Sequence, residues 1–197
     1  MRIKSEIQNK ELIIGDLLFV LERRESMNET EMLQHIRTAY GAMIVEAAAK
    51  HRHRPEVMAG IVMRETQGGL SPLLDRPGPE GRGDRDNNGR LHGHGLCQID
   101  DRSFPAFCAS PDWKDAAKNI AMGAWALGRK RAFLAARTLG FKLTNDDLEK
   151  AAIAAYNAGE GRVMKAIEQE HDPDNCTAHG DYAAAVLRYA ELYLNLG

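Results

Sequence analysis

The chain has 197 residues, of which 44% are hydrophobic and 27% are charged, and its formal net charge is −2. These values are typical of one globular domain that can bury a core. Because the charge is nearly balanced, we expect no nucleic-acid partner and no binding to a membrane surface. The apolar run over 12–21 contains Asp16, is too short to span a bilayer and lacks a small-residue cleavage site. We therefore expect neither a membrane anchor nor a signal peptide.

Three cysteines are present, Cys97, Cys108 and Cys176. An odd number cannot all pair within one chain, and their spacing fits no zinc motif. We expect reduced thiols, because secreted domains more often carry an even disulfide framework. One disulfide stays open as the alternative.

The N-terminal part of the chain is predicted to be helical. Residues 5–24 carry apolar side chains at roughly helical spacing. Asn28 is a suitable N-cap for a second helix, and Glu31, three residues later, completes a capping box. We assign 1–50 to a helical segment whose apolar side packs on a domain spanning 51–197.

The next predicted helix begins at Pro55, a residue that suits a first helical turn. Glu65 lies near the C-terminal end of this helix, because Gly68 and Gly69 stop it. The apolar stripe of the helix consists of Val57, Met58, Ile61 and Val62.

Residues 66–95 differ from the rest, with eight glycines and three prolines. A helix-free stretch of this length in a compact domain is usually functional or disordered. The polar turn residues between Asp84 and Gly89 indicate a β-turn or small hairpin. Further helices are predicted over 112–138, 144–158, 160–170 and 180–195.

Glu65 has the properties of a general acid. It emerges at the edge of an apolar helix, and partial burial raises the pKa of a carboxyl group, which keeps a proton available near neutral pH. Four segments, in this order, resemble the goose-type lysozymes and the related lytic transglycosylases: 60–69, 93–100, 154–159 and 179–189. The resemblance covers about residues 40–195. It implies a mainly α, lysozyme-like fold in which a small β-hairpin or irregular lobe, 66–95, borders a substrate cleft.

The resemblance also implies roles for individual residues. Glu65 occupies the place of the general acid, and Gln98 would line the sugar cleft. Tyr156 and Asn157 match a Tyr-Asn-Ala-Gly motif that contacts sugar. The segment that would form the last wall of the cleft carries His179 and Tyr182. Cys97 stands where the family usually has methionine, a replacement of one soft, apolar side chain by another.

The second carboxylate distinguishes two reactions on this scaffold. An inverting hydrolase needs one roughly 6.5–9.5 Å from the acid to activate water, whereas a lytic transglycosylase uses the substrate's own hydroxyl and forms an anhydro sugar. Asp84 and Asp100 resemble aspartates that hold water in goose-type lysozymes. We therefore predict hydrolysis of the β-1,4 bond between N-acetylmuramic acid and N-acetylglucosamine, and place more weight on Asp100. Asp86 and Asp101 are possible substitutes.

Metal binding is not predicted, and no cofactor is required. The pattern from Asp84 to Gly89 fits the first half of a calcium loop, but the twelfth position is Gly95 instead of glutamate. The histidine pairs lack partners at ligand spacing, so we expect no zinc. We expect Trp113 and Trp125 to lie in the core, since tryptophans at helical positions are more often buried there.

The expected partner is the glycan strand of bacterial peptidoglycan, and we expect a monomer. Chitin oligomers remain an alternative substrate, because they present the same N-acetylglucosamine chemistry. A module that binds amino-sugar polymers without cutting them is the non-enzyme alternative. The site of action would be the cell wall, outside the cytoplasm. Without a signal peptide, the protein would need another export route or delivery as a phage lysin or effector.

Overall fold

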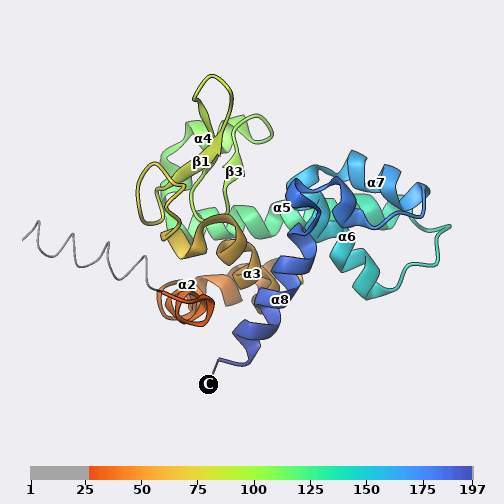
Figure 1. The fold of residues 1–197 in the computed structure, drawn as a ribbon, viewed down its shortest axis with the longest axis horizontal. Coiled ribbons are helices and arrows are strands. Elements are labelled where there is room, and N and C mark those ends of the chain that lie inside the picture. Colours follow the sequence, from red (N-terminus) through yellow and green to blue (C-terminus); the bar gives the residue numbers. More distant parts are fainter. Residues whose placement is uncertain (1–26, 197) are drawn as a thin grey trace, which may run out of the picture.

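The computed structural model describes residues 27–196, which contain seven α-helices and one small three-stranded sheet. This confirms the predicted mainly α fold (Figure 1). The helix predicted over 5–24 lies outside the described residues. The α-helices are α2 (Glu29–His51), α3 (Pro55–Thr66), α4 (Pro105–Ala109), α5 (Ala116–Arg137), α6 (Asn145–Ala158), α7 (Glu160–Glu168) and α8 (Tyr182–Leu194).

The helix boundaries follow the local signals in the sequence. Asn28 and Glu31 form both hydrogen bonds of the predicted capping box at the start of α2. Pro55 occupies the first turn of α3, and Thr144 caps α6 with a second capping box. Two short elements were not predicted, the strand β3 (Ile99–Asp100) and the helix α4. Elements of two and five residues are too short to show a hydrophobic period.

The three strands form an antiparallel sheet in the order β1-β2-β3. Strand β1 (Arg82–Arg85) and strand β2 (Leu91–His94) enclose the turn-rich segment, as the sequence predicted, and Gly83 pairs with Gly93. Strand β3 then pairs with β2, which places Asp100 opposite Gly93. In Figure 1 this sheet and α4 form a separate lobe beside one end of α5.

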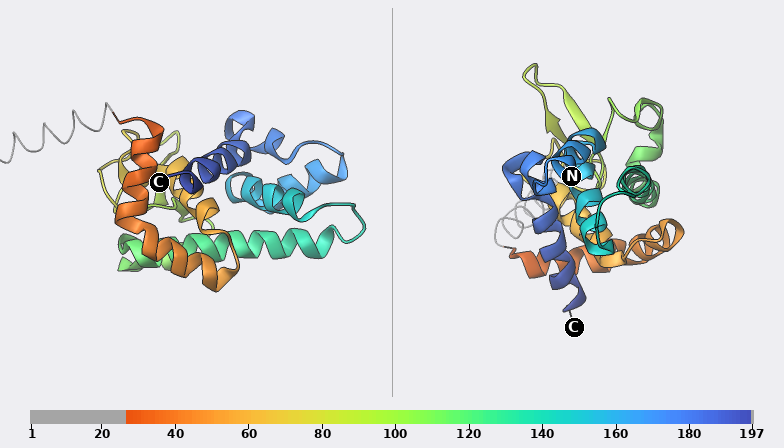
Figure 2. Two further views of the ribbon diagram at one scale, coloured as in Figure 1. Left: turned by 90° about the horizontal axis from the view of Figure 1, so that it is seen from below. Right: turned by 90° about the vertical axis from the view of Figure 1, so that its right-hand side faces the viewer.

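The hydrophobic core lies among α2, α3, α5, α6 and α8. Helix α5 is a long rod that runs along one side of the molecule, and α2 crosses it near one end (Figure 2). Leu33, Ile36 and Ile44 of α2 belong to the same core as α3. The N-terminal helix that the structure describes therefore packs directly on the helix that carries Glu65.

Helices α3 and α8 approach each other very closely. A Cβ atom added at Gly60 of α3 would lie 2.4 Å from the backbone oxygen of Val186 in α8. All residues from Val57 to Met63 are buried. Helix α3 is therefore held on all sides except at its C-terminal end, where Arg64 and Glu65 reach the surface of a cavity.

One prediction about the core is wrong. Trp125 is 37% exposed on α5, where Arg129 stacks over its ring and Phe104 contacts its edge. Trp113 is half-buried against His94. The three cysteines are free. Within residues 27–196, no helix is long and apolar enough to cross a membrane.

Candidate active site

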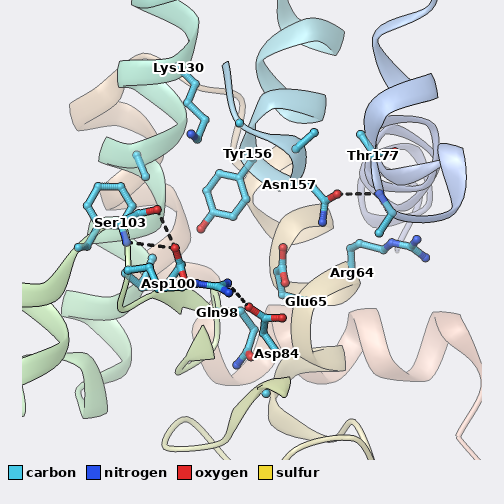
Figure 3. A pocket seen from close by; sticks show the side chains of 18 of the residues that line it. Arg64, Glu65, Asp84, Gln98, Asp100, Ser103, Lys130, Tyr156, Asn157 and Thr177 are labelled. Atoms are coloured by element: carbon cyan, nitrogen blue, oxygen red, sulfur yellow. Dashed lines mark hydrogen bonds and ion pairs between the residues drawn. The ribbon is translucent and has the colours of Figure 1, made fainter. Parts of the chain in front are cut away.

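A cavity of about 1010 Å³ is lined by residues of the β-sheet lobe and by residues of the helices α6 and α7. Its walls come from the end of α3, the loop after it, β1, the segment 98–104, α5, α6 and residues 176–178. Figure 3 shows three carboxylates around this space, from Glu65, Asp84 and Asp100. Segments that lie far apart in the sequence thus contribute acidic groups to one cavity.

Glu65 lies deep in the cavity wall. Its carboxylate accepts a hydrogen bond from the hydroxyl of Tyr182, the first residue of α8. Burial raises the pKa of Glu65 to about 7, although Tyr182 and Arg64 oppose the rise, and the negative charge of Asp84 adds to it. Glu65 can therefore hold a proton near neutral pH, which is the property that a general acid requires.

The end of α3 is fixed by Thr66. Its hydroxyl donates to the carbonyl of Val62, 3.1 Å away, and approaches that of Leu96 at 2.9 Å. The same hydroxyl accepts the backbone N–H of Gly69 at 3.2 Å. Because Leu96 belongs to the segment that leads to Asp100, these bonds fix Glu65 relative to the opposite wall of the cavity.

Replacing Tyr182 with phenylalanine should change the titration of Glu65. The lost hydrogen bond stabilises the ionised carboxylate, so the pKa of Glu65 should rise by about one unit, equivalent to about 1.4 kcal/mol. The alkaline limb of the pH–activity profile should then move to higher pH. NMR titration of labelled glutamate measures this shift, and an unchanged or lowered pKa would contradict it.

The two aspartates share one arginine. Arg102 Nη2 donates to Asp84 Oδ2 at 2.5 Å, and Arg102 Nε donates to Asp100 Oδ1 at 2.7 Å. Asp100 Oδ2 also accepts the backbone N–H and the hydroxyl of Ser103, at 3.1 and 2.7 Å. Burial raises the pKa of Asp100, but the hydrogen bonds from Ser103 and Arg102 outweigh it and hold that pKa below its usual value.

Gln98 lines the cavity and also holds the β-sheet lobe together. Its side-chain amide donates to the carbonyls of Gly95 and Gly81, at 2.7 and 3.3 Å. A Cβ atom at Gly83 or Gly93 would lie 2.5 or 2.2 Å from Gln98 Oε1. Gly83 and Gly93 therefore make room for the side chain of the glutamine.

Tyr156 and Asn157 lie where α6 borders the cavity (Figure 3). The Tyr156 hydroxyl donates to the carbonyl of Cys97 at 2.9 Å. Asn157 Oδ1 accepts the backbone N–H of Ala178 at 2.8 Å. Tyr182 is buried, donates its hydroxyl to Glu65 and does not line the cavity. His179 lies on an exposed 3-10 turn and is absent from the cavity wall.

The two substitute carboxylates lie elsewhere. Asp86 and Asp101 flank His92, whose ring nitrogens are 3.2 and 2.7 Å from their oxygens. Asp86 also accepts two backbone N–H groups of the hairpin turn, from Asn88 and Arg90. Neither carboxylate lines the cavity.

One group of side chains lies at metal-ligand spacing, with atoms of His92, Asp100 and Asp101 within 4.8 Å of one another. Both nitrogens of His92 already contact carboxylates, and both oxygens of Asp100 accept hydrogen bonds from Arg102 and Ser103. These contacts explain why the three side chains lie close together: they form a hydrogen-bond network that supports the sheet. Asp84 and Asp86 of the calcium-like pattern likewise have different partners, Arg102 and the hairpin backbone.

Sequence reasoning missed three residues that shape the site. Arg102 and Ser103 lie two and three residues after Asp100, so their proximity to it was visible in the sequence, but the bond from Arg102 to Asp84 was not. Asn119 of α5 is fully buried, and its side chain bonds the backbone of Cys97, His94 and Trp113. Nothing in the sequence around Asn119 indicates this role.

The geometry provides a carboxyl group with a raised pKa on one wall of the cavity and two further carboxylates, held by Arg102, on the other. This arrangement suits protonation of a leaving oxygen from one side and activation of water from the other. The lysozyme g family model matches residues 23–197, most of the chain. No curated protein matches the sequence. The chain therefore belongs to the lysozyme g family, and it is a glycosidase of the muramidase type that degrades the peptidoglycan of bacterial cell walls.

Proposed function

We propose that this lysozyme hydrolyses the β-1,4 bond between N-acetylmuramic acid and N-acetylglucosamine, with Glu65 as general acid and the Asp84–Asp100 pair opposite it as the group that positions and activates water. The observation that supports this most strongly is the raised pKa of Glu65, about 7, in a cavity that also contains the two aspartates held by Arg102. The pKa of Glu65 is raised and that of Asp100 is lowered, a difference that suits an acid and a group that assists the base.

In the proposed reaction, the proton of Glu65 passes to the glycosidic oxygen as its bond to the anomeric carbon breaks. A water molecule held by the aspartates attacks that carbon from the opposite face and gives a proton to a carboxylate. The product therefore has the inverted, α configuration. Gln98, Tyr156 and Asn157 border the cavity and are proposed to contact the sugars. Tyr182 is proposed to act through Glu65, and a sugar contact for His179 remains a proposal from the family resemblance alone.

Lytic transglycosylation is the alternative that product analysis distinguishes. Digestion of defined peptidoglycan fragments in ¹⁸O-labelled water should place the label at the new reducing end, which NMR should show as the α-anomer first. A transglycosylase product would instead have a 1,6-anhydro ring and no label, and its mass would be 18 units below that of the unlabelled hydrolysis product. Parallel digestion of chitin oligomers tests that substrate, and we expect peptidoglycan to be preferred. We further propose a monomer with no nucleic-acid or membrane partner.

The pH dependence of activity should be bell-shaped. Glu65 must be protonated, so kcat/KM should fall as pH rises through about 7. The aspartates must be ionised, and the pKa of Asp100 is lowered, so activity should persist into acidic solution before it falls. Rates on a soluble peptidoglycan fragment from pH 3 to 9 measure both limbs. An alkaline limb near pH 4.5, the usual pKa of glutamate, would contradict the raised pKa of Glu65.

A further inference from the structure

We propose that Arg102 is a positioning residue that divides the work between the two aspartates. It holds Asp84 in place as the base that activates water, and Asp100 serves with Ser103 to anchor the guanidinium group. This inference rests on the proposed hydrolytic mechanism and names which carboxylate acts in it. The sequence favoured Asp100, and the hydrogen bonds of the site point to Asp84.

Asp100 has little capacity left for a water molecule. Its Oδ1 accepts Arg102 Nε, and its Oδ2 accepts both the N–H and the hydroxyl of Ser103. Its side chain is 29% exposed. A base must take a proton from water along a free lone pair, within about 2.6–3.2 Å. The hydrogen bonds to Asp100 make it a poor base and a good anchor.

Asp84 differs in each of these respects. Only Oδ2 is engaged, by Arg102, and no residue in the described range 27–196 donates to its Oδ1. The side chain is 55% exposed and lines the cavity. Its charge also reaches Glu65, since it helps to raise the pKa of that carboxyl, whereas Asp100 does not contribute. Asp84 therefore has a free oxygen and electrostatic contact with the acid.

Arg102 connects the two aspartates through its planar fork. Asp84 belongs to β1 and Asp100 to β3, so the guanidinium links the two outer strands of the sheet at the cavity wall. Its positive charge offsets the electrostatic repulsion between the two neighbouring carboxylates. Asp84 has a φ of 50°, in the left-handed region that non-glycine residues rarely adopt. The ion pair holds the side chain in place from this unusual backbone position.

The test compares Asp84→Ala, Asp100→Ala, Arg102→Gln and Arg102→Lys, with Arg90→Gln as the matched control. Arg90 also pairs with an aspartate, Asp101, which follows β3 directly and lies 3.3 Å away, but Arg90 lies outside the cavity. We expect kcat to fall about 10²–10⁴-fold in Asp84→Ala, as for loss of a general base. In Asp100→Ala and Arg102→Gln, kcat should fall on the order of 10²-fold because Asp84 is no longer held in position, and KM should change little. Arg102→Lys should recover part of the rate, since lysine keeps the charge but not the fork.

Two readouts separate positioning from general loss of structure. Azide should rescue Asp84→Ala, because it can attack the anomeric carbon without a base while Glu65 protonates the leaving oxygen, and the product is an α-glycosyl azide. It should not rescue Asp100→Ala. In addition, Asp84→Ala should lower the pKa of Glu65 in an NMR titration, and Asp100→Ala should not.

Opposite outcomes overturn the proposal. Azide rescue of Asp100→Ala alone would make Asp100 the base, and full activity of Arg102→Gln would remove its positioning role. Failure of the hydrolytic mechanism itself looks different, because the unaltered enzyme would then release 1,6-anhydro products without label. A folded state for each variant is checked by its melting temperature, and Arg102 is 57% exposed, so its replacement should leave the core intact.

Discussion

Replacing Glu65 with glutamine is expected to abolish lysis of purified cell walls. Glutamine preserves the shape of the side chain but carries no acidic proton, so the leaving oxygen must depart unprotonated. General acid catalysis typically contributes about 10²–10⁴-fold to a rate, and a turbidity assay detects a loss of that size. Full activity in this variant would remove Glu65 from the mechanism and leave the family membership unaffected.

The Glu65→Gln variant should also remain folded, and its stability provides the control. The native state raises the pKa of Glu65 from 4.5 to about 7, so between these pH values the native state binds more protons than the unfolded state. The free energy of unfolding must therefore fall as pH rises across this window. The fall in the free energy of unfolding should be about 1–3 kcal/mol, because part of the carboxyl faces the cavity and solvent there weakens the effect. Glutamine does not titrate, so the variant should gain this amount relative to the unaltered protein between pH 4 and pH 8.

Replacing Gly60 with alanine is expected to produce the largest loss of stability. The added Cβ would lie 2.4 Å from the Val186 carbonyl oxygen and 3.2 Å from its side chain, so α3 and α8 must separate. Overpacking of this kind lowers the free energy of unfolding by about 1–3 kcal/mol, and here the atom that must move belongs to the backbone of α8. Activity should fall as well, because α3 carries Glu65 and α8 carries Tyr182, which bonds it. Chemical denaturation and kcat measured on the folded fraction check both effects.

Gly161→Ala is the matched control for Gly60→Ala. It makes the same change in a helix, α7, but no atom lies within 4 Å of the added Cβ. Alanine favours helix over glycine by about 0.5–1 kcal/mol, so this variant should be as stable as the unaltered protein or more so. Equal destabilisation by both substitutions would show that close approach of α3 and α8 is not the cause.

The sequence by itself determined the features that depend on near neighbours in the chain. The capping box at Asn28, the start of α3 at Pro55 and the position of Glu65 before a glycine pair all follow from local rules. The hairpin between β1 and β2 was visible in its turn residues. Four short segments in the right order then indicated the family, which the match to residues 23–197 confirms.

Only the tertiary structure decided how distant residues combine. Trp125 has a helical position typical of core residues, yet it is exposed, because burial depends on which face of α5 the sheet lobe and α6 cover. The pattern around Asp84 and Asp100 named both aspartates but could not show that Arg102 joins them. The bonds available to a carboxylate are set by donors brought near it in space, and a sequence records only neighbours along the chain. For the same reason, Glu65 could be placed at the end of a helix from sequence, but its pKa of about 7 depends on burial beside Tyr182, Arg64 and Asp84.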